Sequence, residues 1–175
     1  MKKIIITLVF SIVSYFVSAQ TAFDKYDNQD GVTAVSVNKK MFQMMGNVKV
    51  DASDKETQQY LALIKKLDKL KVYTTASSSI SADMKFTVNQ YLKSAGLEEL
   101  ISSNENGNNL RIWVKSGGTE NQIKELLMFS EAPNKDNQTV LMSLMGNFDI
   151  HELAVLTDKM KIPGGEDLKN AAKGK

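Results

Sequence analysis

Four short apolar or alternating runs, separated by turn residues, constrain the fold of this chain more than any other feature. They cover residues 98–104, 109–115, 122–130 and 139–146. Asn106-Gly107 separates the first two, and Asn-Gly is the strongest short hairpin signal because both residues tolerate the positive φ of a type I′ turn. Ser116-Gly117-Gly118 and the polar stretch 133–137 separate the others. This spacing predicts a four-stranded antiparallel meander.

Two further strands are predicted before the meander. Residues 32–37 form a β-branched run, and residues 70–76 alternate and are rich in β-branched and aromatic side chains. The run at 140–145 is nearly continuous in apolar residues, which is typical of a strand with both faces covered. We therefore expect the last strand of the meander to lie inside the sheet.

Three amphipathic helices and a short helical turn at 39–45 are predicted between and after the strands. Capping-type spacings start helices at Ser53 to Glu56 and at Asp149 to Glu152, and Gly96 is placed to end the middle helix. The apolar residues at helical spacing are Tyr60, Leu63, Ile64 and Leu67, then Met84, Val88, Tyr91, Leu92 and Ala95, then Ile150, Leu153, Ala154, Thr157 and Met160.

The predicted order of elements, β-α-α-β-α-β-β-β-β-α, indicates an α+β fold. We expect a mostly antiparallel sheet with the helices packed on one face. Residues 31–162 form a single domain in this interpretation. The polar, aperiodic residues 20–30 are predicted to be a flexible lead-in, and the lysine-rich residues 163–175 a flexible tail.

Residues 1–19 have the organisation of a cleavable signal peptide. Lys2 and Lys3 precede an apolar stretch of about ten residues, and Val17-Ser18-Ala19 supplies the small residues that signal peptidase recognises. Cleavage is expected between Ala19 and Gln20. The mature chain is then exported and lies in the periplasm or outside the cell.

Cysteine and charge set two further expectations. The chain contains no cysteine, so neither a disulfide nor a lipid-bearing thiol is available, and no membrane anchor is expected after cleavage. Removing Lys2 and Lys3 leaves 20 basic residues against 20 acidic ones. This balance does not suggest a strongly basic face, and we expect no nucleic-acid partner.

Four segments of the chain resemble a known family. They are the leader end Val17-Ser18-Ala19-Gln20, the start VTAVSVNKKMFQMM at 32–45, the strand NNLRIWVK at 108–115, and the close LMSLMGNFDIHELAVLTDKM at 141–160. Together they are similar to the bacterial domain-of-unknown-function family 4252. The resemblance implies a small exported protein of Gram-negative bacteria. Many members carry lipid anchors, and the family has no assigned activity.

Few residues suggest catalysis or metal binding. His151 is the only histidine, no G-x-S-x-G motif precedes it, and one histidine without cysteine cannot form the usual zinc site. Asp24, Asp27 and Asp30 lack the order of an EF-hand loop. We therefore expect no catalytic residue and no cofactor. Whether the chain is an enzyme stays open, and we favour the interpretation that it is not.

Two groups of side chains are candidate binding sites. Met41, Met44 and Met45 share one helical face and are candidate Cu(I) ligands, although methionines at such spacing also fill cores. On the strand at 109–115, Arg111, Trp113 and Lys115 share a face opposite Ile112. These three residues form either a binding surface or, for the tryptophan, part of the core.

Two functions follow from these observations. The first is a noncatalytic binding or structural module of the bacterial cell envelope that uses a sheet face or edge to contact an envelope protein or a second copy of itself. The alternative is a small extracytoplasmic enzyme or ligand binder built on carboxylates and hydroxyls, such as Asp83 with Ser79 and Ser81.

Overall fold

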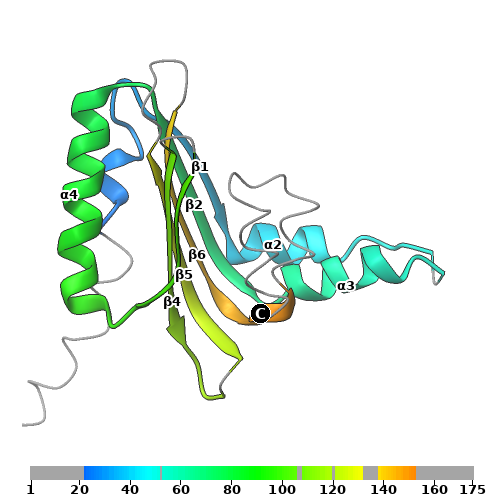
Figure 1. Cartoon of the computed structure of the whole chain (residues 1–175). Helices are drawn as coiled ribbons and strands as arrows, with labels where there is room; N and C mark the ends of the chain where they lie inside the picture. Colours follow the sequence, from blue (N-terminus) through cyan, green and yellow to red (C-terminus); the bar gives the residue numbers. More distant parts are fainter. Residues whose placement is uncertain (1–21, 52, 106–107, 120, 132–137, 153–175) are drawn as a thin grey trace, which may run out of the picture.

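A computed structural model describes residues 22–51, 53–105, 108–119, 121–131 and 138–152. Six strands form one antiparallel sheet in the order β1-β2-β6-β5-β4-β3 (Figure 1). The elements are η2 (Asp24–Tyr26), β1 (Thr33–Asn38), α2 (Lys39–Gly46), α3 (Lys55–Ile64), β2 (Leu67–Thr75), α4 (Ser78–Ala95), β3 (Glu98–Glu105), β4 (Asn108–Ser116), β5 (Gln122–Glu131), β6 (Thr139–Asp149) and η3 (Ile150–Glu152). The α+β fold class is confirmed.

The four strands predicted for the meander are β3, β4, β5 and β6, and each pairs with the next. β6 also pairs with β2, so the last strand of the meander lies inside the sheet, as its apolar run predicts. Residues 139–144 are all buried. β1 and β3 are the two outer strands.

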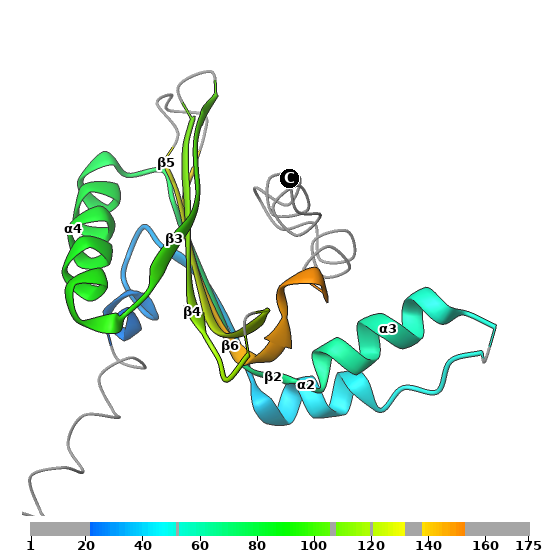
Figure 2. The same cartoon turned by 60° about the horizontal axis from the view of Figure 1, so that its bottom comes forward.

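Alternate residues of the central strands enter two separate apolar cores. On β5, Leu127 and Phe129 pack with α4, whereas Met128 points to the opposite face. α2 contributes Phe42 to that second core, and α3 adds its own buried residues there. Figure 2 shows α4 on one side of the sheet and the α2–α3 pair on the other. The expectation that all helices pack on one face is therefore wrong, because both sheet faces are apolar.

Side-chain caps and one glycine fix the ends of the helices. The Ser77 side chain accepts a hydrogen bond from the Ile80 amide at the start of α4, and Gly96 follows the helix with a φ of 64°. That left-handed conformation suits glycine, as predicted. Asp54, one residue after the predicted Ser53, caps α3 by accepting from the Thr57 amide.

The start of the predicted last helix is also in place. The Asp149 amide donates to Glu152 Oε2 at 3.0 Å, and the His151 amide donates to Asp149 Oδ1 at 2.9 Å. The bond to Glu152 is one half of a capping box, and the bond to Asp149 is an N-cap bond from the second residue of the turn. The rest of that helix from residue 153, the leader at 1–19 and the tail at 163–175 lie outside the described residues. No helix of the described residues is both long and apolar enough to span a bilayer.

The segment at 22–30 differs from the flexible lead-in that its composition predicts. Phe23 and Tyr26 are buried in the core under α4, and the Tyr26 hydroxyl donates to Asp83 Oδ2 at 2.7 Å. The ring of Tyr26 meets the ring of Tyr73 edge-on, with 5.6 Å between the centroids. A polar stretch is ordered here because its few aromatic rings reach the core.

A buried lysine holds the same segment on the sheet. Lys71 Nζ lies 2.6 Å from Asp24 Oδ1 and 2.6 Å from Asp27 Oδ2, and the Tyr73 hydroxyl donates to Asp27 at 2.8 Å. Burial alone would raise the pKa of Asp27, but the bonds from Lys71 and Tyr73 outweigh it and hold that pKa below its usual value. Burial likewise lowers the pKa of Lys71, yet its carboxylate partners raise it overall. Both groups therefore stay charged in the folded protein at neutral pH.

Replacing Lys71 by methionine should lower the free energy of unfolding by about 1 to 3 kcal/mol at neutral pH, because three charge-assisted hydrogen bonds to Asp24 and Asp27 are lost. Urea denaturation measures the change. The difference in free energy of unfolding between the variant and wild type should be largest between pH 3.8 and pH 10.5, which are the ordinary pKa values of aspartate and lysine. It should shrink as the pH falls through the lowered pKa of Asp27, because protonation of Asp27 then removes from wild type the pair that the variant already lacks.

Lys25→Met is the matched control. Lys25 Nζ also lies 2.6 Å from an aspartate, Asp83, but both side chains are almost half exposed. Exposed pairs contribute at most about 1 kcal/mol. Equal losses in the two variants, or a loss at Lys71 that does not change with pH, would show that residues 22–30 are not held by this ion pair.

Candidate functional site

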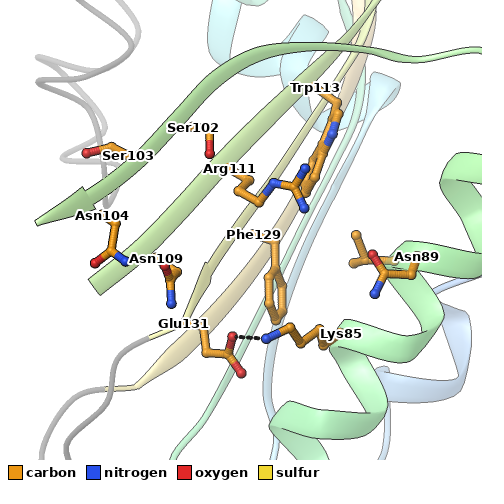
Figure 3. A pocket seen from close by; sticks show the side chains of 11 residues that line it. Lys85, Asn89, Ser102, Ser103, Asn104, Asn109, Arg111, Trp113, Phe129 and Glu131 are labelled. Carbon is orange, nitrogen blue, oxygen red and sulfur yellow. Dashed lines mark hydrogen bonds and ion pairs between the residues drawn. The ribbon is translucent and has the colours of Figure 1, made fainter. Parts of the chain in front are cut away.

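A cavity of about 380 Å³ lies between α4 and the β3-β4-β5 part of the sheet (Figure 3). Strand register builds its sheet wall in two rows. Arg111 on β4 is paired with Ser102 on β3 and with Phe129 on β5. In the next row toward the turns, Asn109 is paired with Asn104 and with Glu131. These two rows therefore place two amides, a hydroxyl, a guanidinium and a carboxylate beside the Phe129 ring.

α4 supplies the opposite wall. Lys85, Val88 and Asn89 are three and four residues apart, so they share one face of the helix and line the cavity together. Lys85 Nζ lies 2.6 Å from Glu131 Oε2, and this ion pair crosses from helix to strand (Figure 3). It closes one end of the cavity and joins its two walls.

Arg111 and Trp113 form the other end. The Arg111 guanidinium carbon lies 4.9 Å from the centroid of the Trp113 ring, and the same guanidinium pairs with Glu99 on β3. Trp113 is only 5 % exposed and belongs to the core under α4. Trp113 could have been part of a binding surface or part of the core, and the structure places it in the core. The Arg111 guanidinium lies over its ring.

The charges of the cavity are compensated in pairs. Lys85 is balanced by Glu131, and Arg111 by Glu99. The remaining polar groups are amides and hydroxyls, which donate and accept hydrogen bonds at once. Such a lining suits a polar ligand without net charge, including the main chain of a peptide. The aromatic edges of Trp113 and Phe129 add apolar contact.

The three residues predicted to form a binding surface do not all lie at one site. Arg111 and Trp113 line this cavity, whereas Lys115 lines a different one, described below. Sequence reasoning missed the residues of β3 and α4. The β3 residues had a usable signal, because a two-residue Asn-Gly turn places Asn104 opposite Asn109. Nothing local to α4 indicates which strand its polar residues face.

The other candidates do not form a site together. Ser81 bonds Thr139 in the interior, Ser79 bonds Ser77, and Asp83 binds the segment at 22–30. His151 lies exposed in η3. Within the described residues, no three histidine, cysteine or acidic side chains gather as metal ligands.

Two of the remaining candidates have clear positions. Met41, Met44 and Met45 lie on α2 and are exposed. The aspartates at 24 and 27 are partners of Lys71, so the ammonium occupies the place that a cation would need. Asp30 is exposed next to Gly31, whose φ is 83°, as expected of a turn.

Arg111→Met should expose the Trp113 ring. We expect a red shift of the tryptophan emission and stronger quenching by acrylamide, because the guanidinium no longer covers the ring. The free energy of unfolding should fall by about 1 kcal/mol. Trp113 is the only tryptophan, so the whole signal reports this cavity.

Lys115→Met is the control, since Lys115 is an exposed cation four residues after Arg111 on the same strand and does not line this cavity. Unchanged quenching in Arg111→Met would mean that the guanidinium does not shield the ring.

Residues 26–156 match the model of a family described as a domain of unknown function, DUF4252. The match includes β1 to β6 and α4, and therefore both walls of the cavity. No curated protein and no solved structure matches the chain. The family expected from the sequence motifs is confirmed: the chain belongs to the DUF4252 family.

Proposed function

We propose that this protein is an exported, noncatalytic binding module of the bacterial cell envelope that holds an extended segment of another envelope protein in the cavity beside β3. One observation carries the proposal: the cavity is bounded by an outer strand. Ser102 and Asn104 of β3 line it, and within the described sheet β3 pairs only with β4. A peptide could add a strand to β3 and place a side chain in the cavity.

The side chains of β3 favour a different protein over a second copy. Glu98 is exposed on this strand, whereas the charge of the exposed Glu99 is balanced by Arg111. Two copies paired edge to edge would bring like charges together, which natural edge strands use to avoid self-association. A neutral or basic segment from a partner meets no such repulsion. The cavity also supports a peptide ligand, because its charges are paired and its amides can bond the main chain of a peptide.

Export is supported by the leader. Lys2 and Lys3, the apolar stretch that follows them and Val17-Ser18-Ala19 have the order of a signal peptide. The absence of cysteine is consistent with a product that keeps no lipid. Cleavage before Gln20 would leave every described residue in the mature protein.

Expression of the full chain in a Gram-negative host should yield a processed protein that begins at Gln20 in the periplasm or the medium. N-terminal sequencing of each cell fraction identifies the cleavage site. Ala19→Arg should block processing, because signal peptidase requires a small residue there. A cytoplasmic product that retains Met1 would contradict the proposed export.

A photo-crosslinking amino acid placed at Asn104 should capture one extended segment of an envelope protein. The same amino acid at Lys93, exposed on α4 and outside the cavity, is the control position. A synthetic peptide of the captured segment should then change the Trp113 fluorescence. Arg111→Met should weaken its binding by about tenfold, as truncation of an arginine anchor commonly does.

Envelope extract provides the opposing test. If the extract changes the Trp113 fluorescence after complete protease digestion, and saccharide hydrolysis removes the effect, the ligand is a glycan and the peptide proposal is wrong. Equal adducts at Asn104 and Lys93 would also reject it. The peptide proposal requires an effect that protease abolishes.

A further inference from the structure

α2 exposes apolar side chains to solvent. Met41 is 47 % exposed, Met44 66 %, Met45 38 %, and Val48, just after the helix, 60 %. The three methionines lie within about two helical turns, so they form one patch. Contiguous exposed apolar groups of this kind mark a surface that contacts a partner or a membrane.

The helix that carries this patch is held firmly. Phe42 is 1 % exposed and anchors α2 in the second core, and the Asn38 side chain caps the helix by accepting from the Met41 amide. Gly46 lets α3 approach closely: a Cβ there would lie 2.6 Å from Lys65 Cγ and 3.3 Å from the Leu61 carbonyl. The methionines are therefore presented by a fixed helix.

A second, open cavity of about 930 Å³ begins where α2 begins. Asn38 and Lys39 line it. Strand register continues the lining across the sheet, because Asn38 pairs with Lys69, Lys69 with Met145, Met145 with Glu125, and Glu125 with Lys115. This row faces the same side as α4 but lies beyond Tyr91, near the end of that helix. Lys124 also lines the cavity.

The lysines of this cavity exceed its available acids. Lys39 pairs with Asp68 at 2.7 Å, but within the described residues no ion pair forms at Lys69, Lys115 or Lys124. Glu125 is buried and accepts a hydrogen bond from the Tyr91 hydroxyl at 2.7 Å, and burial raises its pKa. Residues 39–50 add Lys40 and Lys49 without any acid. The even balance of the whole mature chain thus conceals a local excess of positive charge.

We propose that this end of the molecule, which we call the α2 end (Lys39, Lys69, Lys115 and Lys124 with Met41, Met44, Met45 and Val48), binds the surface of an anionic phospholipid bilayer. The lysines contact lipid phosphates, and the thioethers and Val48 enter the boundary between headgroups and acyl chains. This surface begins at the β1 edge and crosses the sheet as far as Lys115 on β4. It is separated from the first cavity along the strands, because Arg111 and Asn109 line that cavity four and six residues before Lys115. It is independent of the proposed peptide site.

The lysines and the exposed apolar side chains of the α2 end together favour one ligand over the others. Soluble phosphate would satisfy the lysines but leave the methionines in water. A second copy would cover the methionines but bring two lysine-rich surfaces together, which costs electrostatic energy. An anionic bilayer complements both groups at once.

The test is flotation of the chain from Gln20 onward with vesicles, so that the leader cannot insert. It should bind vesicles of equal parts phosphatidylglycerol and phosphatidylcholine, release with added salt, and ignore pure phosphatidylcholine. Lys115→Glu with Lys124→Glu should weaken binding at least about tenfold, since each lysine near such a surface contributes on the order of fivefold. Met41→Ser with Met44→Ser should weaken it similarly through the lost apolar contact.

Controls carry the same substitutions elsewhere. The control variants are Phe86→Ser and Lys93→Glu, which should bind vesicles like wild type. Both residues lie on α4, where Phe86 is 60 % exposed and Lys93 is also exposed. Circular dichroism verifies that each variant is folded. The proposal is overturned if wild type does not float, if the controls lose as much, or if inorganic phosphate at the lipid phosphate concentration displaces the protein. It is also overturned if the methionine variants change only the oligomeric state.

Discussion

Burial of both faces of the central strands is the constraint on which the rest of the structure depends. β6 sends Leu141 toward α4 and Met142 to the opposite core, and β5 alternates in the same way. Each of the two apolar faces must be shielded from water by other elements of the chain. α4 and residues 22–26 pack on one face, and α2 and α3 contribute to the other. The positions of both candidate surfaces follow: the first cavity lies between α4 and the sheet, and the second lies beyond the last turn of α4.

Local patterns in the sequence predict the elements better than their placement. The alternating runs and Gly96 specify strands and a helix end through backbone geometry alone, and the structure contains those strands and that helix end. The side of the sheet that a helix covers depends on tertiary contacts, so the amphipathic pattern of α3 could not show it. Asp27 looks like a loop residue until Lys71, 44 residues away, is placed beside it. Strand alternation brought Arg111 and Trp113 together, whereas Lys85 required knowledge of where α4 packs.

The two edges of the sheet differ in chemistry, and the difference separates the two proposed contacts. The β3 edge carries glutamates beside a cavity whose charges are paired. The opposite edge leads into α2 with its exposed thioethers, and the lysines extend from there across the sheet as far as Lys115 on β4. A protein attached to a bilayer through the α2 end would still have its β3 edge available. Polypeptide capture and membrane contact are therefore compatible in one small domain.

The burial of residues 22–26 has a consequence for how the chain is made. The partners of Tyr26, Asp83 and Thr87, lie 57 and 61 residues further along the chain, and the ring of Phe23 meets the ring of Tyr91 edge-on. A chain synthesised from its N-terminus thus presents two aromatic rings well before α4 exists to cover them. Until then these rings remain apolar groups in water, the kind of surface that chaperones bind on incomplete chains. The first described residues therefore reach these contacts only after α4 has been synthesised.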